Sequence, residues 1–273
     1  WGGNNTPSEL APFSRSHGTA GCNAHCSQVA PTISYKRVTY YKILICGTIG
    51  SIKATRMHRT VLLIDTPPAF NFWRTAHSHG WVDLSPFTYN PDKEEITRII
   101  ALDDRASVFA LVKKKLRKVA IVVDSPKPLT TVQKKNIASQ MRTCLRLDED
   151  FSELHRMAAK HPEFKWIATS GAGRLLRSPT VFEDAVKMIC TTNCSWAFTK
   201  LMIGNLCQAF GNKFDEHTYA FPTPEQVVAS TEAFLRKEIK TGYRSPYLIE
   251  LAERVTSRKL NLESWRTSEL TTE

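Results

Sequence analysis

The middle of the chain carries the hydrophobic pattern of an antiparallel sheet. Runs rich in β-branched residues, which are typical of strands, occupy residues 59–66, 95–103, 106–114 and 117–125. The gaps between the last three runs are too short for a parallel crossover, which predicts an antiparallel meander. Amphipathic helices are predicted over residues 69–81, ending at Gly80, and over residues 130–147. We therefore expect an antiparallel, TBP-like α+β domain over residues 57–147.

From residue 148 onward the strand pattern stops and helix signals recur. A hydroxyl residue followed by proline is typical of a helix start, with the hydroxyl at the N-cap and the proline at the first helical position. This pair occurs three times, as Ser178-Pro179, Thr223-Pro224 and Ser245-Pro246. Gln226 completes a capping box with Thr223. Residues 148–273 are predicted to form a helical domain.

Two of these helices flank a polar loop. The helix over residues 179–190 is expected to turn one apolar face to the core, made of Val181, Ala185, Met188 and Phe182. The next helix, over residues 195–210, repeats apolar positions at helical spacing, which predicts core packing for Trp196, Thr199, Ile203, Leu206 and Phe210. Gly211 and Gly242 mark the predicted ends of this helix and of the helix over residues 231–240.

Residues 1–56 have a different composition. They hold six basic residues, a single acid (Glu9), half of the twelve glycines and no methionine, and they show little periodicity. Met57 is followed at once by the first strand pattern. We expect Met57 to be the true start, with residues 1–56 either a non-native extension or a disordered basic tail that touches nucleic acid.

The charge and the cysteine content indicate which kinds of partner and cellular setting suit the chain. The formal net charge is +11, which favours an anionic partner such as nucleic acid or an acidic membrane surface. No run approaches the roughly 20 apolar residues of a membrane span. Seven cysteines without a secretory leader indicate reduced thiols in an intracellular setting. The group Cys22, His25 and Cys26, with His17 nearby, matches no standard zinc spacing, so neither metal nor cofactor is expected.

Residues 190–196, CTTNCSW, are the main candidate for chemistry. Cys190 and Cys194 suggest zinc or a disulfide, but zinc needs further ligands and this spacing lacks the C-x-x-C geometry of redox helices. Asn193 offers both donors and acceptors between two apolar helices that fix its position. A polar loop with Cys190 in the core is the better interpretation.

Three stretches resemble a known family in order and spacing. They are GRLLRSPTVFEDAVKMICTTNCSWAFTKLMIGNLCQAFG, AFPTPEQVVAS and GYRSPYLIELAERV. Together they are similar to the helix-hairpin-helix DNA glycosylases, especially the 8-oxoguanine and 3-methyladenine DNA glycosylase branch. The resemblance covers residues 148–268 in motif, and residues 57–147 more loosely in strand-and-helix order.

That family extrudes a damaged base, hydrolyses its N-glycosidic bond and fills the gap left in the duplex. The resemblance implies that Asn193 fills the gap, Tyr243 wedges beside the orphaned base and Arg244 hydrogen-bonds that base. Thr192 and Ser195, on the same loop as Asn193, are further DNA-binding candidates. From the residues alone, Tyr243 and Arg244 also fit a turn with an exposed arginine.

Other positions leave alternatives open. Arg174 and Arg177 either contact phosphate or pair with Glu183 or Asp184. Phe198 stands where the 8-oxoguanine enzymes carry a second arginine, which puts strict demand for cytosine opposite the lesion in doubt. Asp148, Glu149 and Asp150 fit a helix entrance.

The family's Gly-rich hairpin, its lysine and its catalytic aspartate have no counterpart before Glu273. We therefore expect an incomplete helical domain and a chain that is inactive as given, with no catalytic residue assigned.

The leading hypothesis is a base-excision DNA glycosylase, with or without lyase chemistry, that acts on damaged double-stranded DNA. The alternative is a non-catalytic protein that binds damaged or distorted DNA, and a third possibility is an α+β protein unrelated to nucleic acid. We expect a monomer without membrane attachment, nuclear in a eukaryote or cytoplasmic and nucleoid-associated in a bacterium.

Overall fold

The computed structural model describes residues 57–102 and 106–267. Residues 1–56, and with them the predicted extension and the Cys22/His25/Cys26 group, lie outside the described residues. The first part is a five-stranded antiparallel sheet, and the strands follow one another in the order β1-β5-β4-β3-β2. Their bounds are His58–Asp65 (β1), Lys118–Ser125 (β5), Ser107–Lys115 (β4), Glu95–Ala101 (β3) and Phe87–Asn90 (β2).

The sheet confirms the predicted meander, in which β3, β4 and β5 pair antiparallel in sequence order. Strand β1 pairs antiparallel with the far side of β5. Sequence reasoning missed β2, a four-residue strand paired with β3. Such a strand is too short to show alternation.

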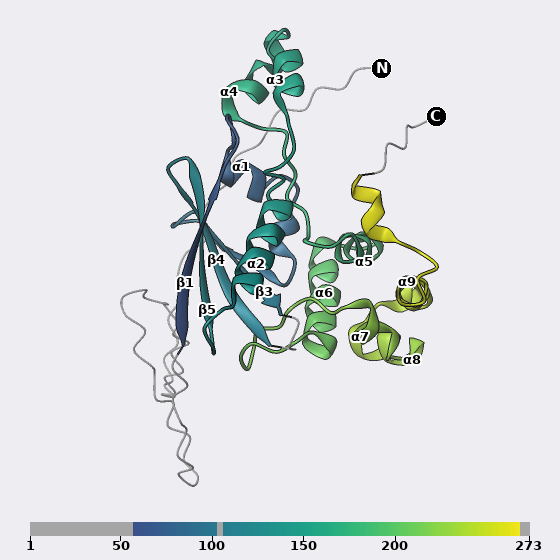
Figure 1. The fold of residues 1–273 in the computed structure, drawn as a ribbon. Helices are drawn as coiled ribbons and strands as arrows, with labels where there is room; N and C mark the ends of the chain where they lie inside the picture. The colour runs from purple at the N-terminus through teal and green to yellow at the C-terminus, as the bar shows by residue number, and fades with distance from the viewer. Residues whose placement is uncertain (1–56, 103–105, 268–273) are drawn as a thin grey trace, which may run out of the picture. The chain divides into compact units, whose positions relative to one another are not determined.

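Helix α2 (Thr131–Cys144) lies along the sheet and buries Ile137, Met141 and Cys144 (Figure 1). A capping box between Thr130 and Gln133 fixes its start. The predicted single helix over residues 69–81 is wrong. It is instead a short helix α1 (Phe72–Ala76) and a 3-10 turn η1 (Trp81–Asp83), separated by Gly80 at φ +90°. That left-handed conformation favours glycine. The helix predicted to end at Gly80 already ends at Ala76.

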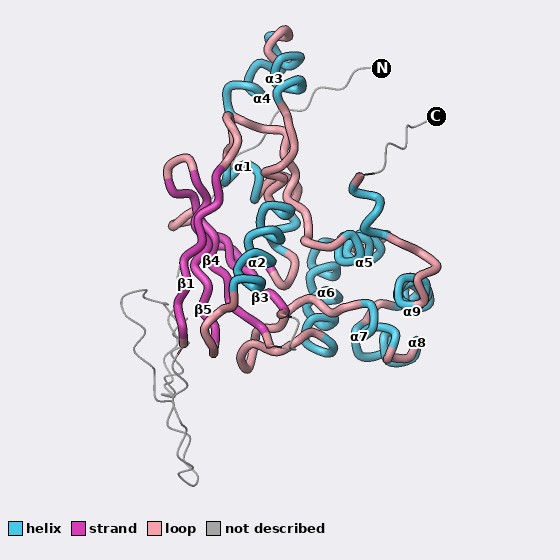
Figure 2. Tube along the Cα trace, in the orientation of Figure 1, coloured by secondary structure: helices cyan, strands magenta, loops and turns pink. Residues whose placement is uncertain are grey.

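All five strands of the described chain lie before Pro126, and after Ser125 its regular elements are helical (Figure 2). This is the predicted α+β class; the TBP-like topology, the domain boundaries and the incompleteness of the helical part stay predictions. The remaining elements are α3 (Ser152–Ala158), η2 (Pro162–Phe164), α4 (Lys165–Ser170), α5 (Val181–Thr191), α6 (Trp196–Phe210), α7 (Pro224–Val228), α8 (Glu232–Phe234), η3 (Leu235–Ile239), η4 (Gly242–Arg244), α9 (Ser245–Thr256) and η5 (Leu262–Arg266).

Two of the three predicted N-caps are wrong. The hydroxyl of Thr223 accepts from the backbone N–H of Gln226, as predicted. Helix α5, however, begins later than expected, because Thr180 and not Ser178 is its N-cap. Ser245 is already inside α9, where its hydroxyl donates to the carbonyl of Gly242.

The buried face of α5 also differs from the prediction. Met188 is 57% exposed, and Val181 and Ala185 are half-buried. The buried residues are Phe182, Glu183, Val186, Lys187 and Cys190. Helix α5 is thus rotated so that two charged side chains enter the core. Cys190 is buried, as expected.

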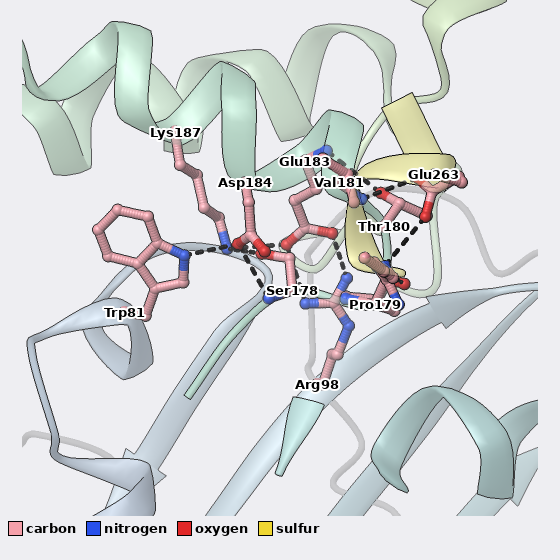
Figure 3. Close-up of polar contacts among 11 residues, drawn as sticks. Trp81, Arg98, Ser178, Pro179, Thr180, Val181, Glu183, Asp184, Lys187 and Glu263 are labelled. Carbon is pink, nitrogen blue, oxygen red and sulfur yellow. Dashed lines mark hydrogen bonds and ion pairs between the residues drawn. The ribbon is translucent and has the colours of Figure 1, made fainter. Parts of the chain in front are cut away.

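These two charges meet Arg98 of β3, and we call Arg98, Glu183 and Lys187 the charge cluster (Figure 3). Arg98 donates to both carboxylate oxygens of Glu183, over 3.0 and 2.5 Å, and Lys187 Nζ donates to the same carboxylate over 2.7 Å. At most 3% of any of these residues is exposed. The cluster joins the sheet to the helical part.

Two tryptophans near Gly80 also join the sheet-containing part to the helical part. The indole N–H of Trp81 donates to Asp184 of α5 over 2.7 Å (Figure 3). In the opposite direction, the indole N–H of Trp196 in α6 donates to Asp83 over 3.1 Å. A Cβ atom on Gly80 would lie 3.0 Å from the Trp196 ring, so the contact is close. The first turn of α6 is thereby anchored to the sheet-containing part.

Within residues 57–102 and 106–267, no helix combines the length and the apolarity needed to cross a membrane.

Candidate functional site

The loop between α5 and α6, residues 192–195, is held at both ends. Thr192 is the C-cap of α5, and the hydroxyl of Ser195 caps α6 by accepting from the backbone N–H of Phe198 over 3.3 Å. Asn193 between them is exposed and has a left-handed backbone, at φ +46°. Asparagine tolerates this conformation better than most residues. The loop therefore presents the Asn193 amide at the surface.

A second segment, about 50 residues later, meets this loop. The 3-10 turn η4 carries Tyr243 and Arg244 directly before α9. The Tyr243 hydroxyl lies 3.2 Å from Thr192 Oγ1, and Asn193 Nδ2 donates to it over 3.4 Å. The Tyr243 ring is 48% exposed, and hydrogen bonding to Thr192 lowers the pKa of its phenol. The structure thus brings Thr192, Asn193, Tyr243 and Arg244 together.

Arg244 is buried, so the interpretation as an exposed turn arginine is wrong. Its Nε donates to Thr192 Oγ1 over 3.2 Å and its second terminal nitrogen donates to the carbonyl of Thr192. The remaining terminal nitrogen donates to the carbonyl of Thr241 over 3.4 Å. The guanidinium also lies 4.5 Å from the centroid of the Tyr243 ring. Arg244 therefore ties the loop to η4.

Arg177 and Arg174 lie in a different part of the structure. Arg177 pairs with Glu149 over 2.8 Å and donates to the carbonyl of Thr143. Arg174 is buried, donates to the carbonyl of Glu149 and lies 4.2 Å from the centroid of the Phe151 ring. The ion-pair alternative named the wrong partner, because Glu183 is taken by the charge cluster. Neither guanidinium joins the 192–195 loop.

The four cysteines among the described residues are free thiols. Among the described residues, no group of three or more His, Cys, Asp or Glu side chains is placed to hold a metal ion. Cys144, Cys190, Cys194 and Cys207 are free thiols, and burial raises the pKa of Cys190 to about 12. The Cys194 thiol donates to the carbonyl of Cys190 over 3.2 Å. Both cysteines serve packing.

Sequence reasoning missed the exposed apolar side chains on the elements that flank the loop. Met188 of α5, Phe198 and Leu201 of α6, and Tyr247 of α9 are all exposed. The helical spacing of apolar residues predicted Met188 to lie in the core. It is exposed because α5 turns a different face to the core.

A cavity of about 870 Å³ lies between the sheet and the helical part, lined from β3, α2, α5 and the segment after α9. The 192–195 loop and Tyr243 do not line it. The gap-filling candidates and this cavity are separate features. The loop itself offers an amide, hydroxyls and an aromatic ring, which suit contact with a base edge or a base face.

Comparison with known proteins gives one curated sequence relative, an N-glycosylase/DNA lyase of Saccharomyces cerevisiae. It is 34% identical over 101 residues, which are 35% of this chain and 26% of the relative. The chain therefore matches about a quarter of that relative's length. No family model matches the chain.

Solved structures share the fold over most of the chain. The 3-methyladenine DNA glycosylase of Archaeoglobus fulgidus superimposes with a TM-score of 0.59 at 18% identity, over 77% of this chain and 70% of that one. The 8-oxoguanine glycosylase/lyase of Clostridium acetobutylicum, in its apo form, superimposes with a TM-score of 0.53 at 20% identity. The match covers 78% of this chain and 70% of that one. At these identities the likeness concerns the fold.

Proposed function

We propose that this chain functions in base-excision repair. The proposal rests on its resemblance to the helix-hairpin-helix DNA glycosylases, which is supported by its fold and by its local sequence similarity. The described residues are the damage-binding part of a DNA N-glycosylase that acts on double-stranded DNA. The observation that carries this proposal is the convergence of the 192–195 loop with Tyr243. The resemblance implies that Asn193 stands at the family's gap-filling position and Tyr243 at its wedge position.

The proposed role follows from the cost of flipping a base. Extruding a nucleotide costs a few kcal/mol of lost stacking and pairing, so a protein that inserts groups into the gap stabilises the opened duplex. In this proposal the Asn193 amide enters the gap and the exposed Tyr243 ring stacks beside it. The loop needs little rearrangement, because Ser195 caps α6 and Arg244 ties Thr192 to η4. Such preorganisation lowers the entropy lost on binding.

Arg244 acts indirectly in this proposal. Its burial and its bonds to Thr192 and Thr241 hold the loop in place, so it shapes the wedge without touching the base. Arg177, which pairs with Glu149, is not part of the proposed interface. We assign no catalytic residue among the described ones, and cleavage of the glycosidic bond is part of the proposal without an assigned residue.

The test compares two duplexes that differ at one position, an intact one and one with a stable tetrahydrofuran abasic site. We expect the 273-residue chain to bind the abasic duplex more tightly, and Asn193→Ala to reduce this preference about tenfold, a loss of about 1.4 kcal/mol. Gln208→Ala removes an exposed amide from the same helical part and should leave the preference unchanged. Equal affinity for both duplexes would refute the proposal.

A further inference from the structure

The turn of the β4–β5 hairpin carries a cluster of exposed basic side chains. They are Lys113, Lys114, Lys115, Arg117 and Lys118. Two of them are neutralised, because Lys113 pairs with Glu95 over 2.9 Å and Lys118 pairs with Asp65 over 2.8 Å. Among the described residues, no acidic side chain pairs with the other three. This end of the hairpin therefore holds three uncompensated positive charges.

The strand pairing at this end also brings like charges together. Lys115 and Lys118 face each other across the two strands, and like charges directly opposite one another destabilise a sheet. The Lys118 ammonium pairs with Asp65 on the neighbouring strand β1, which leaves Lys115 without a counter-ion among the described residues. A bound anion would supply the missing negative charge. The charge pattern is thus better suited to a bound polyanion than to the unbound hairpin.

Leu116 lies at the tip of the turn, between these charges. It is 89% exposed, and its backbone has φ +57°. This left-handed conformation favours glycine and is unfavourable for a bulky residue. Because the side chain is almost fully exposed, its packing contributes little to the stability of the hairpin. A residue that is costly in this conformation and has no packing role indicates a contact outside the chain.

We propose that the β4–β5 hairpin is a second DNA-binding surface, in which Lys114, Lys115 and Arg117 contact backbone phosphates of a duplex. Leu116 packs against the sugars between these phosphates. A duplex presents a dense row of negative charges, which satisfies three neighbouring cations at once. The inference goes beyond the proposed function, because this surface lies on the sheet and binds DNA whether or not a lesion is present. It rests on the proposed function only for the identity of the anion.

The experiment measures the affinity of the 273-residue chain for intact duplex between 50 and 200 mM salt. The variant Lys114→Gln/Lys115→Gln/Arg117→Gln loses three phosphate contacts, and each contact contributes about 0.9 to the slope of log K against log salt. We expect the slope to fall by about 2–3, and the affinity at 50 mM salt to fall about tenfold or more. The preference for abasic over intact duplex should not change, because the Asn193 loop is untouched.

The matched control removes the same number of charges elsewhere. Lys127→Gln/Lys160→Gln/Lys165→Gln changes three exposed lysines, and the slope should fall by less than about 1. An equal fall in slope for both triple variants would overturn the inference, because binding would then depend on the total charge alone. Equal affinity of the original chain for abasic and intact duplex would instead overturn the proposed function, while a difference in slope between the two variants would still support the hairpin surface.

A variant of the tip tests the contact of Leu116. Leu116→Gly keeps the left-handed turn, because glycine favours that conformation, and it removes only a neutral side chain. We expect it to weaken binding to intact and abasic duplex alike, by about threefold or more, with an unchanged salt slope. An affinity equal to that of the original chain would overturn the contact proposed for Leu116.

An anionic membrane is the other polyanion to test. Sedimentation with vesicles of phosphatidylserine and phosphatidylcholine compares the original chain with the variant Lys114→Gln/Lys115→Gln/Arg117→Gln. We expect the two to sediment alike. If the original chain binds the vesicles, and the variant loses that binding while it keeps the original salt slope on DNA, the hairpin contacts membranes and the inference fails.

Discussion

The carboxyl group of Glu183, which joins the sheet to the helical part, makes the stability of the folded state depend on pH. Burial alone would raise the pKa of its carboxyl group, but the charges and hydrogen bonds of Arg98 and Lys187 outweigh this and lower the pKa from 4.5 to about 2. A carboxyl with a depressed pKa stabilises the folded state wherever it is ionised. This stabilisation is fully present above about pH 4.5 and is lost as the pH falls towards 2.

Replacing Glu183 by Gln should therefore be costly at neutral pH. It leaves Arg98 and Lys187 buried without their counter-ion, and breaking a buried pair in this way costs about 3–5 kcal/mol. We expect urea denaturation at pH 7 to show this loss. Because the variant no longer binds a proton at this position, its stability should also fall less than that of the original chain between pH 5 and pH 3. Glu250→Gln is the control, since Glu250 is exposed and its pair with Arg254 is a surface pair.

At the scale of elements, sequence patterns predicted those features that depend on neighbouring residues. They failed for features that depend on a residue far away in the chain. The strands of the meander and the Thr223 capping box depend on neighbouring residues, and both were found. The buried face of α5 was predicted wrongly, because a count of apolar positions cannot foresee Arg98, which lies 85 residues before Glu183.

The candidate site was only partly predictable. Family resemblance pointed to Asn193 and Tyr243, and the structure places them together. The inward turn of Arg244 depends on the carbonyls of Thr192 and Thr241, and backbone groups leave no trace in a sequence pattern. Arg177 pairs with the side chain of Glu149, 28 residues earlier in the chain, and local spacing did not identify that partner.

The anchor between Trp196 and Asp83 gives a prediction at this scale. Asp83→Ala removes the acceptor of the Trp196 indole, and a hydrogen bond to a charged group contributes about 1.5–3 kcal/mol. Because Trp196 begins α6 directly after the 192–195 loop, we expect the preference for abasic duplex to fall as well. Thr223→Ala is the matched control. It loses a cap worth about 0.5–2 kcal/mol far along the chain from the loop, and should keep the preference. An unchanged preference in Asp83→Ala would mean that the bond between Trp196 and Asp83 does not position the loop.

For the whole molecule, the proposed function separates binding into two terms with different responses to salt. The net charge of +11 attracts phosphates regardless of lesion. The logarithm of this part of the binding constant falls linearly with the logarithm of salt concentration, because the release of condensed counter-ions becomes less favourable. The insertion of Asn193 and the stacking of Tyr243 involve neutral side chains, so their contribution should not follow the ionic strength in the same way.

We therefore expect the affinities for abasic and intact duplex to fall with parallel slopes as salt rises from 50 to 200 mM, a range over which the phosphate term changes strongly. The ratio of the two affinities should stay constant. Fluorescence anisotropy with both duplexes at several salt concentrations measures slope and ratio together. If the ratio collapses towards one at the higher salt, the preference arises from charge density at the lesion, and the neutral wedge of Asn193 and Tyr243 is not its source.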